Sequence, residues 1–180
     1  SQQQKRLAAK PIPDLRDLKG ILNGRIFINT ATTNEPRIKF NLQGENFTWG
    51  KPTEPTHFYA AEKVIVKGSF EAGTFRFLPL QIQSQETILS YKGNIGSQEQ
   101  SGQLKIENFP LQRLSNLVKL PVGITGKLNI TAAIAGSITS PQARGVLNIT
   151  EGTIDRKSIE SLNASFAYNN GRLNFDSQLL

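Results

Sequence analysis

Apolar and polar residues alternate along most of this chain, and a glycine leads six of the alternating segments. In each of them, apolar residues stand two and four positions after the glycine, as in Gly-Lys-Leu-Asn-Ile. Side chains two positions apart in a β-strand point to the same face. The pattern therefore predicts repeated strands that are apolar on one side, each begun by its glycine. The six glycines are Gly24, Gly73, Gly102, Gly126, Gly145 and Gly171.

The alternation is longest between residues 124 and 138. Apolar side chains occupy even positions there, whereas polar ones such as Lys127 and Asn129 occupy odd positions. A single strand of this length would extend about 50 Å at roughly 3.3 Å per residue, so we expect a turn near Ala135 and Gly136. A further turn is predicted at residues 169–171, because Asn-Gly between alternating runs is a strong hairpin signal.

One segment changes to a helical period. Between Pro110 and Pro121, apolar residues recur at intervals of three to four, which predicts a short amphipathic helix near residues 110–119. We favour a core-covering role for this helix over a partner-binding one. Its apolar positions are Leu111, Leu114, Leu117 and Val118.

These patterns together predict an all-β fold: an elongated, curved, antiparallel-rich sheet with one short helix. Residues 1–18 are expected to be a linker or lead-in, and residues 19–180 to form the repeating sheet as a fragment of a longer protein. The absence of methionine also favours a processed or excised piece. A closed β-sandwich would use the same alternation and stays open as an alternative.

Composition argues against catalysis. The chain has no cysteine, so thiol nucleophiles and zinc–thiolate sites are excluded. The single histidine, His57, lies in a Thr/Pro-rich loop and is expected to be a surface residue. The 14 acidic residues are scattered without metal-ligand spacing. We therefore expect no enzyme activity, no cofactor and no metal site.

Charge and hydropathy limit the classes of partner that we expect the chain to bind. The net charge of +7 gathers partly in the first 25 residues. The basic residues there are not interleaved with aromatic residues as they are in RNA-binding modules. We therefore favour a solvated linker over a nucleic-acid-binding segment. The longest apolar runs are far shorter than the roughly 20 residues of a membrane-spanning helix. Any membrane anchor would lie outside this segment.

The segment from Gly123 to Phe175 carries a more specific cadence. A glycine-led strand is followed by a second Gly-x-apolar turn, the step Ser140-Pro141, a Gly-x-Leu strand, and a Gly-x-Ile strand leading into a paired strand that contains Tyr168. This cadence resembles the TamB family of translocation and assembly module proteins, within the wider AsmA-like group. The match is weaker from Gly20 to Ile82. The Gln- and Asn-rich background suits a cyanobacterial member or its chloroplast-envelope relative.

The resemblance implies a periplasmic portion of an inner-membrane-anchored envelope protein, or a place in the chloroplast intermembrane space for a plastid relative. It implies a U-sectioned sheet, or β-taco, with a hydrophobic groove. It also implies lipid movement between the inner and outer membranes and association with a BamA-like outer-membrane barrel. The family offers no catalytic residues to carry over.

The expected function is therefore a section of a hydrophobic conduit for phospholipid acyl chains that supports outer-membrane biogenesis. An assembly or translocation module that pairs its strands with barrel or client proteins is the alternative, and a passive spacer with a sealed core is a further one. The residues expected to line the groove are Ile124, Leu128, Ile130, Ile134, Leu147, Ile149, Leu162, Phe166, Leu173 and Phe175.

Overall fold

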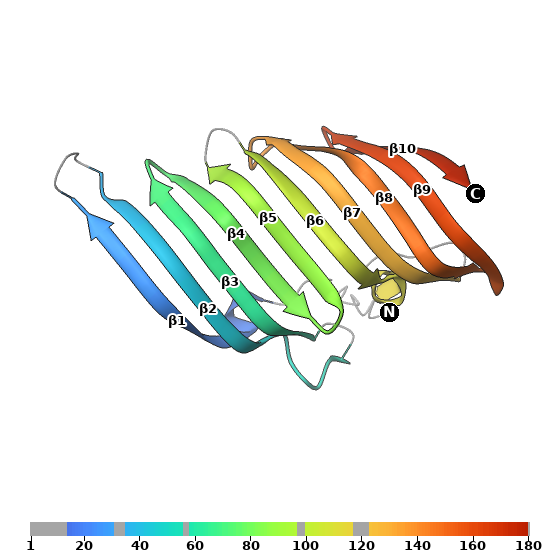
Figure 1. Cartoon of the computed structure of the whole chain (residues 1–180), viewed down its shortest axis with the longest axis horizontal. Helices are drawn as coiled ribbons and strands as arrows, with labels where there is room; N and C mark the ends of the chain where they lie inside the picture. The colour runs from blue at the N-terminus through green and yellow to red at the C-terminus, as the bar shows by residue number, and fades with distance from the viewer. Residues whose placement is uncertain (1–13, 31–34, 56–57, 97–99, 117–122, 180) are drawn as a thin grey trace, which may run out of the picture.

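The computed structural model describes residues 14–30, 35–55, 58–96, 100–116 and 123–179. These residues form one ten-stranded antiparallel sheet in which every strand pairs with its neighbours in sequence (Figure 1). A 3₁₀ turn, η1 (Leu15–Asp17), precedes β1, and a second, η3 (Leu111–Asn116), follows β6. The strands are β1 (Leu18–Asn29), β2 (Arg37–Trp49), β3 (Tyr59–Glu71), β4 (Thr74–Ser84), β5 (Thr87–Gly96), β6 (Ser101–Pro110), β7 (Ile124–Gly136), β8 (Pro141–Ile154), β9 (Lys157–Asn169) and β10 (Arg172–Leu179).

Tight hairpins produce this order. Three two-residue turns have positive φ at both positions, namely residues 72–73, 155–156 and 170–171. Such turns twist in the same sense as the strands they join, which keeps successive strands side by side. The turn after residue 169 confirms the hairpin predicted from Asn-Gly. The turn expected near Gly136 is also confirmed, because β7 ends there and β8 begins at Pro141.

The two faces of the sheet differ in polarity, as the ladder register shows. We call the two sides the apolar face and the polar face. One row of paired positions on the apolar face comprises Leu22, Gly44, Val64, Ile82, Leu89, Ile106, Ile130, Leu147 and Ala164. The adjoining row on the polar face comprises Asn23, Gln43, Ile65, Gln81, Ser90, Lys105, Thr131, Val146, Ser165 and Asp176.

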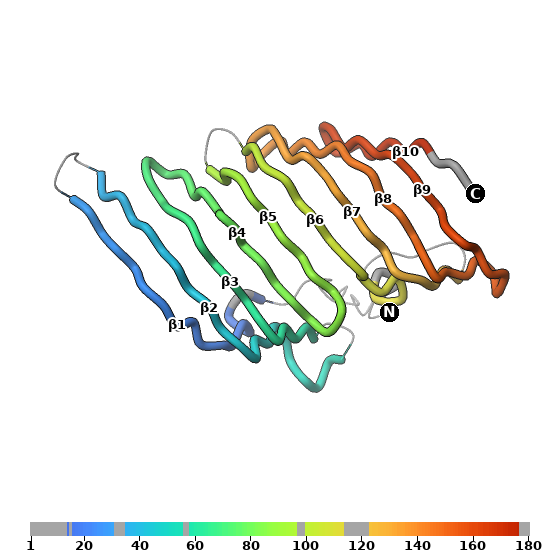
Figure 2. The backbone as a smooth tube through the Cα atoms, viewed as in Figure 1, coloured from blue at the N-terminus to red at the C-terminus, as the bar shows by residue number. Residues whose placement is uncertain are grey.

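The sheet is open and little of it is buried. Figure 2 shows edge strands β1 and β10 at opposite ends of the long axis, and each pairs with one neighbour only. Only six hydrophobic residues in the described part are buried, against twelve large ones that are exposed. The described strands all belong to this one sheet, and no second sheet faces it. The closed β-sandwich is thereby excluded for them.

The predicted helix is shorter and tighter than expected. It is the six-residue 3₁₀ segment η3, and residues 117–119 lie outside the described residues. Its Leu111 forms the buried core with Leu128 and Ile149, surrounded by further apolar residues of β6 to β9. Because η3 covers this part of the apolar face, the core-covering role expected for the segment is confirmed.

The glycine positions and the place of Ile138 differ from what the sequence pattern predicts. Gly24, Gly126 and Gly145 lie inside strands and do not begin them. A Cβ at Gly145 would overlap the carbonyl oxygen of Thr131 on β7, so close backbone approach explains this glycine better than a strand start. Ile138, expected on the long apolar strand, lies instead in the turn after β7 and is 58% exposed.

Candidate functional site

The apolar face carries a cavity of about 520 Å³, which spans β1 to β6. Small-molecule sites in proteins commonly have volumes of this order. Its aliphatic wall lies on the apolar face and includes Leu22, Val64, Val66, Ile82, Leu89 and Ile106. Its aromatic wall is formed by Phe47, Trp49, Tyr59 and Phe109. We call this space the apolar cavity.

Two β-bulges turn aromatic side chains into this cavity. Asn46 in β2 and Asn108 in β6 have φ values of 55° and 54°, in the left-handed region that asparagine tolerates. The register of the sheet shifts beside each of them. The alternation changes phase at the bulge, so Phe47 and Phe109 join the apolar face although they occupy odd positions.

The aromatic wall is held by close packing. The ring of Phe47 occupies the space that a Cβ at Gly20 or Gly44 would need. The rings of Trp49 and Tyr59 lie 6.0 Å apart at a tilt of 40°, a favourable aromatic geometry. Because the Trp49 indole N–H donates to the carbonyl oxygen of Asp14 at 2.9 Å, its apolar ring surface is left to line the cavity.

Polar groups in the wall are few. Thr48, Ser84 and Thr87 contribute hydroxyls, and the Thr87 hydroxyl donates to the carbonyl oxygen of Asn108 at 3.0 Å. Arg113 of η3 is the sole charged side chain among the lining residues. The cavity therefore offers an extensive apolar wall with one cation, which suits noncovalent binding of an apolar chain.

The ten residues expected to line a groove lie on the apolar face, but in β7 to β10 and outside the apolar cavity. Leu128 and Ile149 are buried with Leu111 of η3. Leu173 and Phe175, by contrast, are 51% and 59% exposed at the edge of the sheet. Their contact with lipid stays a prediction.

The cavity wall in β1 to β6 was not predicted from the sequence. The alternation of Ile38, Phe40 and Leu42 signals the apolar face of β2. The aromatic part of the wall depends on the bulge at Asn46. This bulge shifts the alternation, so Phe47 faces the same side as Leu42 although it occupies an odd position. The order Gly-Glu-Asn-Phe after an alternating run was the available signal for that bulge, since asparagine tolerates positive φ.

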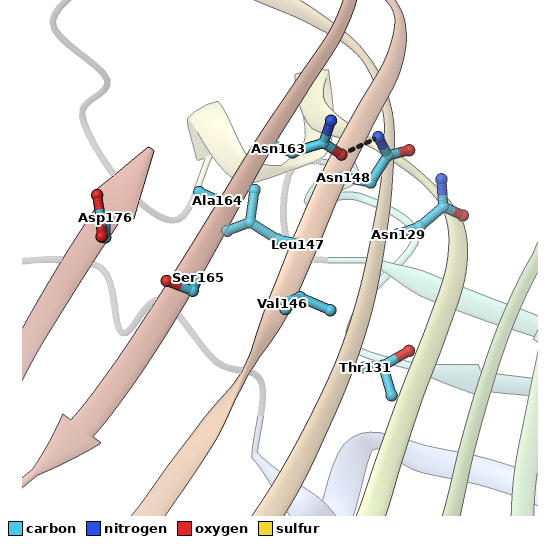
Figure 3. Close-up of a pocket in the computed structure, with 9 residues that line it drawn as sticks. All are labelled: Asn129, Thr131, Val146, Leu147, Asn148, Asn163, Ala164, Ser165 and Asp176. Carbon is cyan, nitrogen blue, oxygen red and sulfur yellow. Dashed lines mark hydrogen bonds between the residues drawn. The ribbon is translucent and has the colours of Figure 1, made fainter. Parts of the chain in front are cut away.

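A second cavity, of about 400 Å³, lies on the polar face over β7 to β10. Figure 3 shows asparagines from three neighbouring strands along one side of it, with Asp176 across from them. The side-chain amide of Asn148 donates to Oδ1 of Asn163 at 2.7 Å. Oδ1 of Asn129 accepts from the backbone N–H of Asn108 at 2.9 Å. These hydrogen bonds link adjacent strands, which gives the asparagines of the polar face a structural role.

Charged groups elsewhere form surface pairs. Lys127 Nζ lies 3.2 Å from carboxylate oxygens of both Glu86 and Glu151, and these two acids raise the pKa of Lys127. Burial raises the pKa of the Tyr91 phenol. No cluster of three or more potential metal ligands occurs among the described residues. His57 lies outside them.

None of the described helical segments is long and apolar enough to cross a membrane. Comparison of the chain with protein-family models, with curated proteins and with solved structures found no match. The function proposed below therefore rests on the apolar face and its cavity.

Proposed function

We propose that this sheet is a section of a hydrophobic conduit that binds phospholipid acyl chains. The observation that supports this proposal most directly is the open apolar face. This face extends across the sheet and contains a cavity lined mainly by aliphatic and aromatic side chains. Burying an acyl chain gains about 0.8 kcal/mol per CH₂ group. An apolar wall of this kind can therefore hold lipid without a dense set of polar contacts.

The resemblance to the TamB family supplies the setting of the proposal. It favours a periplasmic segment that moves phospholipid between the inner and outer membranes and contributes to outer-membrane biogenesis, with a BamA-like barrel as partner. An open, elongated antiparallel sheet is compatible with that setting. The setting itself rests on the cadence from Gly123 to Phe175.

Trp49 provides a direct test of lipid binding. It is the single tryptophan of the chain and lines the apolar cavity. Phospholipid with brominated acyl chains should quench its fluorescence, because bromine quenches indoles at contact distance. Phospholipid of the same chain length without bromine serves as the control ligand.

Paired variants locate the binding. Val64→Asp places a carboxylate in the cavity wall and should abolish the quenching, whereas Ile65→Asp places it one residue along β3 on the polar face and should leave quenching intact. Leu22→Asp tests the same wall. Because Leu22 is 41% exposed, this substitution should destabilise the fold less than Val64→Asp does. Circular dichroism confirms that each variant is folded. Quenching that persists in both cavity variants contradicts the proposal.

A second candidate function is supported by the edge strand β1. Six of the twelve exposed large hydrophobic residues lie in this one strand, and they occur on both of its faces. Long exposed apolar edges are templates for pairing with another strand. This favours the assembly-module alternative, in which a barrel or client strand pairs with β1. Photo-crosslinkers placed along β1 would test it, and absence of any crosslinked partner in cells would count against it.

A further inference from the structure

The single charged side chain that lines the apolar cavity is unpaired among the residues that the structure describes. Arg113 belongs to η3 and lines the cavity. Its guanidinium forms no ion pair with any acidic side chain of the described residues. The remaining lining residues are apolar or carry a hydroxyl, apart from Trp49 with its indole N–H, which already donates to the carbonyl oxygen of Asp14. An arginine presents five N–H donors in a planar fork that matches carboxylate and phosphate oxygens.

The position of Arg113 relative to the apolar wall matters as much as its charge. Phe109, four residues earlier, lines the same cavity, and Leu111 between them is buried in the core cluster at only 4% exposure. The buried leucine anchors η3 on the sheet. The exposed Arg113 is thereby held beside the cavity on an anchored segment, which lowers the conformational entropy lost when it binds a ligand.

We propose that the ligand of the apolar cavity is an anionic lipid, whose chain packs against the aromatic and aliphatic wall and whose head group binds Arg113. This inference rests on the proposed function and adds the charge of the head group and its place in the cavity. A neutral amphiphile would fill the wall equally well but would leave the guanidinium unused. Charge complementarity therefore selects the anionic head group.

Two amphiphiles with the same chain separate the two parts of the site. Dodecyl phosphate and dodecanol, both below the concentrations at which they aggregate, are titrated into the wild-type chain while Trp49 fluorescence is recorded. We expect tighter binding of dodecyl phosphate. Inorganic phosphate at millimolar concentration is the third arm, and it should not displace the amphiphile because it lacks the chain.

The variant Arg113→Gln should weaken dodecyl phosphate binding by about fivefold or more while leaving dodecanol binding unchanged. Arg113→Lys should retain part of the preference. The matched control is Arg144→Gln, which removes the same charge from an exposed position of β8 on the polar face. It should change neither affinity, which separates a local contact from the general attraction of a chain with a net charge of +7.

The outcomes distinguish this inference from the function on which it rests. If the wild-type chain binds neither amphiphile, the proposed lipid-binding function fails and this inference fails with it. If both amphiphiles bind but Arg113→Gln lowers neither affinity, or lowers both equally, only the head-group assignment is overturned. It is also overturned if Arg144→Gln has the same effect as Arg113→Gln.

Discussion

Leu111 of η3 and Leu128 of β7 share one buried cluster on the apolar face, and each is more than nine-tenths buried. Within a sheet that is mostly exposed, this is its main sealed core. Truncation of Leu111 to alanine should therefore lower the free energy of unfolding by about 2–4 kcal/mol. Chemical denaturation followed by circular dichroism measures the change.

The matched control for that prediction is Val146→Ala. Val146 is 58% exposed on the polar face, so its truncation should change the unfolding free energy by no more than about 0.5 kcal/mol. Equal losses from the two truncations would show that η3 adds nothing beyond an ordinary surface contact.

Gly68 of β3 should not tolerate a side chain. Its φ is 154°, and a Cβ there would overlap the carbonyl oxygen of Arg76 on the neighbouring strand. We expect Gly68→Ala to destabilise the sheet by about 1–3 kcal/mol. Gly123→Ala is the control, because a Cβ at Gly123 meets nothing within 4 Å. Thermal unfolding of the two variants compares them, and a Gly68→Ala midpoint as high as that of Gly123→Ala would refute the steric argument.

Tyr91 should make the sheet sensitive to alkali. Its side chain is 5% exposed, and burial raises the pKa of the phenol above its ordinary value near 10. Above pH 10 the unfolded chain therefore loses this proton before the folded chain does, and the stability that Tyr91 contributes is lost as the pH rises. Lys127 has a raised pKa as well and acts in the same direction.

The variant Tyr91→Phe isolates the phenol. It removes the hydrogen bond that the hydroxyl donates to the carbonyl oxygen of Asn94, so it should be less stable at neutral pH. Its stability should also fall less steeply above pH 10 than that of the wild type. Unfolding free energies measured from pH 8 to pH 11 provide the test, and parallel curves would contradict the assignment.

The exposed edge should cause self-association. Phe27 of β1 is 61% exposed on the polar face, at the outer edge of the sheet. We expect the wild-type chain to associate with rising concentration and Phe27→Lys to shift it towards the monomer. Thr131→Lys introduces the same charge at an exposed position of the inner strand β7 and should leave the association unchanged. Analytical ultracentrifugation over a range of concentrations provides the test. A wild-type chain that stays monomeric at every concentration would contradict self-association through β1.

Local patterns could be predicted from the sequence because they depend on neighbouring residues. The alternation around Leu128 and Ile130 predicts a one-sided strand, and Asn170-Gly171 predicts a hairpin, because both depend on backbone preferences within a few residues. The all-β class follows from the same local signals.

The cavity could not be predicted in the same way. At Asn46 a single residue with positive φ reverses which side chains face the apolar side, so Phe47 cannot be assigned to a face by counting positions from Leu42. Whether the sheet closes depends on contacts between distant strands, and alternation is the same in open and closed sheets. The place of Arg113 depends likewise on how Leu111 seats η3 in the core.

The pairing of each strand with its sequence neighbours alone makes the reach of this sheet adjustable. Adjacent strands lie about 4.8 Å apart, so one hairpin contributes roughly 10 Å of width. Insertion or loss of a whole hairpin preserves strand direction and leaves every remaining ladder intact. Such an architecture can be lengthened or shortened in steps to match the distance it must cover, and its edges can fray without loss of the middle.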